Sequence, residues 1–117
     1  MPEKGLRTRR VAELVQAEVS RILIGELQDA ASGLLTVTRV EMTPDLLSAR
    51  VFLSVFGGDG PEAALARLER SRGHIRRVLA SRIKLKYNPE LFFVLDPGPG
   101  HQDRIDRLIE ERKRHGH

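Results

Sequence analysis

Basic residues are the side chains of this sequence with the clearest chemical potential, and they gather in two segments. Residues 67–86 have a net charge of +7 and residues 1–10 have +3, although the whole chain of 117 residues has only +4. Arginine and lysine bind phosphate oxygens through charge-assisted hydrogen bonds. One such run is usually a solvated helix face, but two runs on an otherwise acidic chain favour a phosphate-rich partner such as a nucleic acid.

Residue types that support catalysis or metal binding are missing or badly spaced. The chain has no cysteine, which excludes disulfides, thiolate nucleophiles and iron–sulfur clusters. Its four histidines have no partner at a metal-ligand spacing, and no serine lies in a G-x-S-x-G motif. Carboxylate pairs such as Asp103 and Asp106 fit helix capping better than acid–base catalysis. We therefore expect no catalytic residue, metal, cofactor or small-molecule substrate.

Aromatic residues that could stack on nucleic-acid bases are few. All four phenylalanines lie in predicted strands, and Phe52 and Phe56 fall on the face opposite Val51 and Val55. These two are the candidates for stacking, but packing in the core explains them better. Recognition of phosphates and of shape by arginine is therefore favoured over stacking.

The segment GGDG at 57–60 has the G-x-x-G pattern with which KH domains clamp an RNA backbone. In a KH domain that loop joins two helices, whereas here it follows a predicted strand and precedes a predicted helix. An ordinary glycine-rich turn is therefore the better interpretation.

Hydrophobic periodicity predicts the elements that position the basic residues. Val11, Val15 and Val19 recur at helical spacing and predict a helix over residues 8–26. Residues 34–42 and 48–56 are β-branched or alternating and predict two strands, joined as an antiparallel hairpin through a turn at TPDLL.

The second basic segment follows Pro61, which suits a first helical position. Its apolar stripe would also contain Arg72 if the helix were straight. Gly73 is the expected break, because glycine costs about 1 kcal/mol in a helix interior. We therefore expect a kinked pair of helices, 61–71 and 73–83.

The remaining sequence predicts a third strand and a tail. The apolar run LFFVLD at 91–96 indicates a strand that is central in the sheet or buried on both faces. Prolines and glycines at 97–100 end regular structure, Asp103 can cap a short helix, and the polar ending should be disordered. The result is one α+β domain over 1–97, with helices on one face of a three-stranded sheet, and a tail over 98–117.

The chain contains no apolar run near the roughly 20 residues that span a membrane, and no secretory signal at its start. We expect a soluble cytoplasmic protein without a membrane partner.

Four segments together resemble the bacterial ribosome-binding factor A family. They are RVAELVQAEVSRIL, LLTVTRVEMTPDLLSARVFLSVFG, SRGHIRRVLASRIKLKYNPELFFVLD and RIDRLIEE, and the likeness extends over residues 9–111. The resemblance implies a type II KH-like fold, αββααβ, in which a kink between two helices replaces the G-x-x-G loop. The family has this kink at Ala-x-Gly, which corresponds here to Ser71-Arg72-Gly73, so Ser71 and Gly73 are assigned to the interhelical kink.

The resemblance also implies a function without enzymatic activity. Family members bind the free 30S ribosomal subunit, contact its 16S rRNA, assist late maturation and processing of that RNA, and matter most for growth in the cold. We expect a monomer. The RNA-binding residues that the resemblance implies are Arg70, Arg72, Arg76, Arg77, Arg82, Lys84 and Lys86, with Arg7, Arg9 and Arg10 as a second patch.

Two other functions remain open from the residues themselves. One is a general single-stranded RNA or DNA binder that uses the KH-like sheet. The other is a small nuclease, although the sequence offers it neither a metal cluster nor a plausible base.

Overall fold

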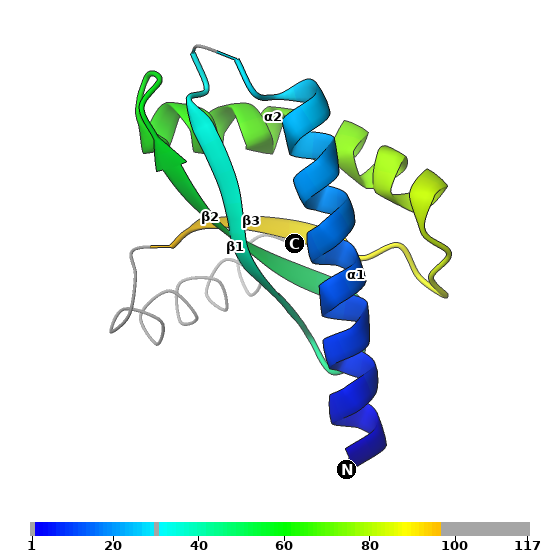
Figure 1. The fold of residues 1–117 in the computed structure, drawn as a ribbon. Helices are drawn as coiled ribbons and strands as arrows, with labels where there is room; N and C mark the ends of the chain where they lie inside the picture. Colours follow the sequence, from blue (N-terminus) through cyan, green and yellow to red (C-terminus); the bar gives the residue numbers. More distant parts are fainter. Residues whose placement is uncertain (1, 30, 97–117) are drawn as a thin grey trace, which may run out of the picture.

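The computed structural model describes residues 2–29 and 31–96, with side chains from residue 7 onward. The elements in chain order are α1 (Pro2–Glu26), β1 (Leu34–Met42), β2 (Ser48–Phe56), α2 (Pro61–Arg82) and β3 (Glu90–Leu95) (Figure 1). The α+β class is confirmed, and β1 and β2 have the predicted bounds. Helix α1 begins earlier than predicted, because Pro2 has the fixed φ that suits a first helical turn.

The strands form one sheet with the order β1-β2-β3 in the described part of the chain. β1 and β2 are antiparallel, whereas β2 and β3 are parallel because α2 carries the chain back across the sheet. β3 is therefore an edge strand, so that of the two predicted alternatives the central position is excluded and burial on both faces is confirmed. Its apolar sequence reflects burial on both faces instead, since Leu91 and Phe93 are buried on one face and Phe92 on the other.

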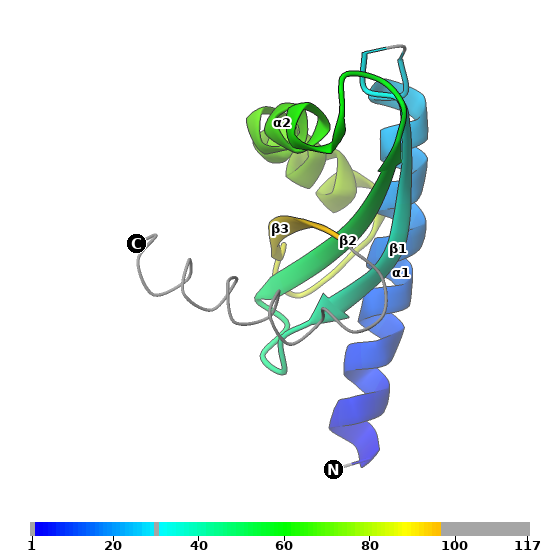
Figure 2. The same cartoon turned by 90° about the vertical axis from the view of Figure 1, so that its left-hand side faces the viewer.

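The main core lies between the two helices and one face of the sheet. A single cluster of buried side chains joins Val19 of α1, Leu79 of α2 and Val51 of β2. Helix α1 lies along β1, while α2 crosses the sheet and contacts β3 (Figure 2). This arrangement agrees with the KH-like fold class.

The predicted division of α2 into two helices is wrong. The helix is continuous over Pro61–Arg82, and its buried residues are Ala64, Leu68, Ile75 and Leu79. Leu68 and Ile75 are two turns apart, so the apolar stripe stays in phase across Gly73 and both halves pack on the same core. This burial outweighs the cost of about 1 kcal/mol for one internal glycine. A bend of the continuous helix at Ser71 and Gly73 stays a prediction.

The glycine-rich segment 57–60 is a turn between β2 and α2, as predicted. It packs against the loop after α1, where Asp59 N–H donates to the Ala31 carbonyl at 2.8 Å. A Cβ on Gly58, whose φ is +64, would lie 2.5 Å from that same carbonyl oxygen. The close approach of two loops therefore accounts for glycine at this position.

The predicted tail at 98–117 lies outside the described residues. This holds for its short helix, for the cap at Asp103, for the disordered ending and for the boundary after residue 97.

Candidate nucleic-acid interface

A pocket of about 380 Å³ lies where the N-terminal half of α1, the β1–β2 turn and the α2–β3 loop meet. The turn lies beside the N-terminal half of α1 in both views (Figures 1 and 2). Arg7 lines this pocket from α1, and Lys84 and Lys86 line it from the α2–β3 loop. All three residues are exposed. We call this site the basic pocket, and it joins the two basic segments that are far apart in the sequence.

The basic pocket combines an apolar floor with an exposed aromatic ring. Val11, Leu46 and Leu85 line it and are half-buried against the main core. Tyr87 also lines it and is 53% exposed, with Lys86 Nζ 5.5 Å from the ring centroid. Tyr87 is not among the residues predicted from the sequence. Its position directly after the alternating lysines of the segment Lys84-Leu85-Lys86 is the signal that could have found it.

The Arg76 side chain is hydrogen-bonded to the backbone of the α2–β3 loop. Its Nε donates to the Pro89 carbonyl and its Nη2 to the Asn88 carbonyl, each at 3.0 Å. The Asn88 side chain donates back to the Arg76 carbonyl at 3.3 Å. Arg76 therefore fastens the middle of α2 to the loop before β3, and these two donors are not free for phosphates.

Arg72 is likewise half-buried at the edge of the apolar stripe of α2. Its Nη1 lies 3.4 Å from the Leu91 carbonyl, and its Nη2 lies 3.5 Å from a Glu69 carboxylate oxygen. The long side chain carries the charge out of the stripe, so the helix needs no break to accommodate it.

Other predicted residues present their charges to solvent. Arg70 and Arg77 are exposed on α2, two turns apart on one side of the helix, and neither makes an ion pair within residues 7–29 and 31–96. Arg9 and Arg10 are exposed on α1. Arg82 is exposed as well, with its Nη1 3.7 Å from Glu18 of α1. The structure thus separates the predicted cations into open and occupied ones.

A hydrogen bond and an ion pair also tie α2 to the end of α1 and the following loop. His74 Nε2 lies 3.0 Å from a Glu26 oxygen, and Arg67 Nη2 lies 2.7 Å from Asp29 Oδ2. The Ser32 backbone N–H donates to Asp29 Oδ1 at 2.7 Å. This hydrogen bond and the Arg67 guanidinium lower the pKa of Asp29 below its ordinary value. Because the Arg67 charge is paired with Asp29, this part of α2 is less basic than its sequence indicates.

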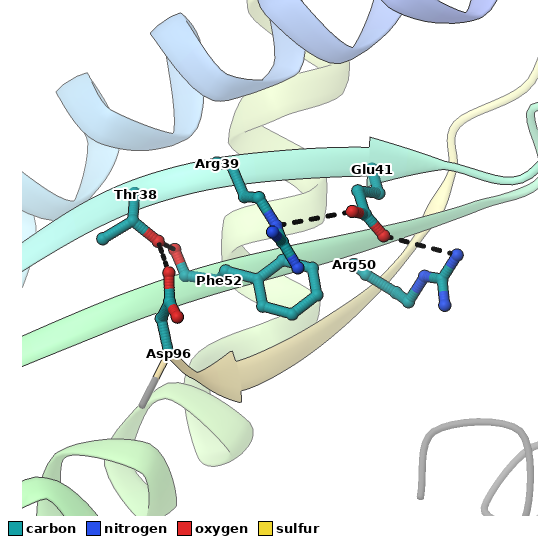
Figure 3. Close-up of polar contacts among 6 residues, drawn as sticks. All are labelled: Thr38, Arg39, Glu41, Arg50, Phe52 and Asp96. Carbon is teal, nitrogen blue, oxygen red and sulfur yellow. Dashed lines mark hydrogen bonds and ion pairs between the residues drawn. The ribbon is translucent and has the colours of Figure 1, made fainter. Parts of the chain in front are cut away.

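The sheet face turned away from the main core carries a second cluster of charge around an aromatic ring (Figure 3). We call it the second sheet face, and its residues are Thr38, Arg39, Glu41, Arg50, Phe52 and Asp96. The Arg39 guanidinium lies 4.0 Å above the Phe52 ring, and Glu41 lies within 3.5 Å of both arginines. Phe52 is 0% exposed, so it is not available to stack on a base. Phe56, the other candidate, is 80% exposed at the end of β2.

The described residues offer little to support other kinds of site. Within residues 7–29 and 31–96, no three His, Asp or Glu side chains are grouped so that they could hold a metal ion. No helix of that part is long and apolar enough to cross a bilayer.

Comparisons with known proteins identify relatives over most of the chain. The sequence profile described as ribosome-binding factor A matches residues 7–109. The chain is 41% identical over 106 residues to ribosome-binding factor A of Thermomicrobium roseum, and this alignment covers 90% of the chain and 82% of the relative.

Solved structures of similar proteins share the fold. The crystal structure of ribosome-binding factor A from Thermus thermophilus matches with a TM-score of 0.68 at 22% identity, covering 75% of this chain and 94% of the other. A homology model of the T. thermophilus factor, fitted into a cryo-EM map of its complex with the 30S subunit, matches with a TM-score of 0.57 at 30% identity, covering 69% and 90%. The profile match and the identity to the T. roseum protein show that this chain belongs to the ribosome-binding factor A family.

Proposed function

We propose that this protein binds the free 30S ribosomal subunit, where it assists late maturation of the subunit and processing of its 16S rRNA. It acts by holding an rRNA conformation through phosphate contacts and has no enzymatic activity. It works in the cytoplasm as a monomer. Cells that lack it should show their largest growth defect in the cold.

The observation that carries this proposal is the convergence of the two basic segments at the basic pocket. Arg70 and Arg77 extend the open positive charge along α2. Membership of a ribosome-binding family, and the fit of the T. thermophilus factor into a 30S complex, support the 30S subunit as the source of the phosphates.

Co-sedimentation with purified 30S subunits, 50S subunits and 70S ribosomes tests the partner. The protein should sediment with free 30S subunits in preference to the other two particles. Repeating the assay over a salt series tests the mechanism, because log affinity should fall against log salt with a slope of about −0.7 to −0.9 per phosphate neutralised. Equal binding to all particles, or an affinity insensitive to salt, would contradict the proposal.

A general single-stranded nucleic-acid binder is the alternative, and oligonucleotides separate the two functions. Short RNA and DNA oligomers should bind far more weakly than 30S subunits if the particle is the true partner. Comparable affinity for oligomers and subunits would favour the general binder. Incubation of rRNA with the protein and Mg²⁺ should leave the RNA intact, whereas degradation would indicate a nuclease.

A further inference from the structure

We propose that the basic pocket receives one unpaired nucleotide of the RNA, whose base stacks on Tyr87 while its phosphates lie against Arg7, Lys84 and Lys86. This inference rests on the proposed function, because the RNA is taken to be that of the ribosomal subunit. It adds a mode of recognition that phosphate contacts alone do not require.

The size and lining of the pocket suit such a ligand. Its volume of about 380 Å³ lies at the lower end of the roughly 300–1,000 Å³ of small-ligand sites. The apolar part of the lining, here called the floor, consists of Val11, Leu46 and Leu85, which can contact a flat base. Tyr87, at 53% exposure, leaves part of its ring open beside that floor. Aromatic rings of this kind stack on unpaired bases regardless of base identity.

The charges around the pocket point to a ligand that carries phosphate. Three cations line the pocket against one carboxylate, that of Asp45. Asp45 Oδ1 accepts hydrogen bonds from the Thr43 hydroxyl at 2.6 Å and from the Leu47 backbone N–H at 3.0 Å. The carboxylate therefore helps to hold the β1–β2 turn in place, and the net charge of the residues that line the pocket is positive.

The backbone of the same turn is held in an uncommon conformation. Leu46 has φ 63, and no other residue apart from glycine has a positive φ in residues 2–29 and 31–96. The Leu46 N–H donates to the Thr43 carbonyl at 2.8 Å, which fixes this geometry and places Leu46 in the pocket wall. Such conformations cluster at binding sites, where the surrounding structure enforces them.

Another concave site, near Arg67 and Arg70 of α2, is less suitable. A cavity of about 350 Å³ lies beside Ser71, between α2 and the end of α1. Its cationic candidate, His74, faces the Glu26 carboxylate at 3.0 Å, so a phosphate there would meet an acidic neighbour. It also lacks an aromatic ring among its lining residues, which are Glu26, Leu27, Ser71, His74 and Ile75.

The decisive experiment compares Tyr87→Ala, Tyr87→Phe and Phe56→Ala in the 30S co-sedimentation assay. Loss of one base-stacking contact should weaken binding of Tyr87→Ala about tenfold, while Tyr87→Phe keeps the ring and should bind like the wild type. Phe56→Ala removes a still more exposed ring, 80% against 53%, that does not line the pocket, and it should also bind like the wild type. If the wild type binds 30S subunits and Tyr87→Ala binds equally well, the pocket proposal is overturned while the proposed function stands. If the wild type does not bind, the proposed function itself fails.

A second measurement is independent of any variant's folding. Tyr87 is the one tyrosine of the chain, so its ring signals in the NMR spectrum of the wild type are identified without ambiguity. Addition of a single-stranded RNA tetranucleotide should shift them upfield through the ring current of the stacked base. Ring signals that stay unchanged at millimolar tetranucleotide would overturn the proposal.

Discussion

The basic pocket and the second sheet face each place a cation beside an aromatic ring, yet the two rings differ in how much of them is exposed. In the pocket, Lys86 lies 5.5 Å from the ring of Tyr87, which is 53% exposed. On the second sheet face, the Arg39 guanidinium lies 4.0 Å from the centroid of the fully buried Phe52 ring, and Arg39 Nε lies 3.4 Å from a Glu41 carboxylate oxygen. Residue types alone therefore do not distinguish a ring that is open to a ligand from a ring that is packed inside the protein, whereas the burial of the ring does.

The largest expected effect falls on the second sheet face. Phe52→Ala should lower the free energy of unfolding by about 3–5 kcal/mol, because it removes a fully buried aromatic ring. Tyr87→Ala is the matched change in the pocket and should cost less than about 1 kcal/mol, since that ring is half exposed. Urea unfolding of both variants measures the contrast. Equal losses of stability would remove the distinction between the two regions.

The next effect concerns the charge of the basic pocket. The triple variant Arg7→Gln, Lys84→Gln and Lys86→Gln should lose about 3 kcal/mol of binding free energy toward 30S subunits, because each cation contributes about one phosphate contact. Its log–log salt slope should be shallower than that of the wild type by about 2 to 3. Arg21→Gln on α1, where Arg21 already pairs with Glu18 at 2.6 Å, is the control and should leave the slope unchanged. A triple variant with the slope of the wild type would place the phosphates elsewhere.

A smaller effect distinguishes two neighbouring arginines of α2. Arg76→Ala should lower the free energy of unfolding by about 1–3 kcal/mol, because it leaves the Pro89 and Asn88 carbonyls without their donor. Arg77→Ala should change stability by less than about 0.5 kcal/mol, since that side chain is exposed, and should weaken 30S binding instead. Thermal unfolding and co-sedimentation of both variants provide the test. The reverse pattern would show that Arg76 is the phosphate ligand and Arg77 the structural residue.

The smallest effect is a pH dependence at the loop after α1. The pKa of Asp29 is lowered in the folded state by the Ser32 backbone N–H and by Arg67. Its contribution to stability is therefore complete above the unfolded-state pKa and is lost as the pH falls through the folded-state pKa. The wild type should be more stable than Asp29→Asn at neutral pH, and the two should converge in acid. Urea unfolding across this pH range measures the difference, and a gap that persisted in acid would contradict the assignment.

Much of the fold could be predicted from local patterns. The strands β1 and β2 have the expected bounds because their side chains alternate and a turn segment separates them. The predicted division of α2 is wrong because Arg72 falls within the apolar stripe of a straight helix, which suggested a break there. In the structure its long side chain instead extends to the Leu91 carbonyl. A pattern of residue types contains no information on where a flexible side chain ends.

For the candidate site, the sequence predicts which residue types are present but not which of those residues are open to a ligand. The sequence identified the cations, yet it could not tell that Arg76 donates to backbone carbonyls while Arg77 is open. It also missed Tyr87, because exposure of a ring depends on which loops meet around it. The convergence of Arg7 with Lys84 and Lys86 likewise depends on the antiparallel path of β1 and β2 and on the crossover through α2.

The sequence by itself determined the class of the protein and its family resemblance, and it predicted a phosphate-rich partner. These follow from periodicity, from motif order and from the segregation of basic residues, all of which are properties of neighbours along the chain. Only the tertiary structure decided which cations are open, which ring is exposed and where the two basic segments meet. Those properties depend on contacts between residues distant in sequence, which packing of the helices against one face of the sheet brings about.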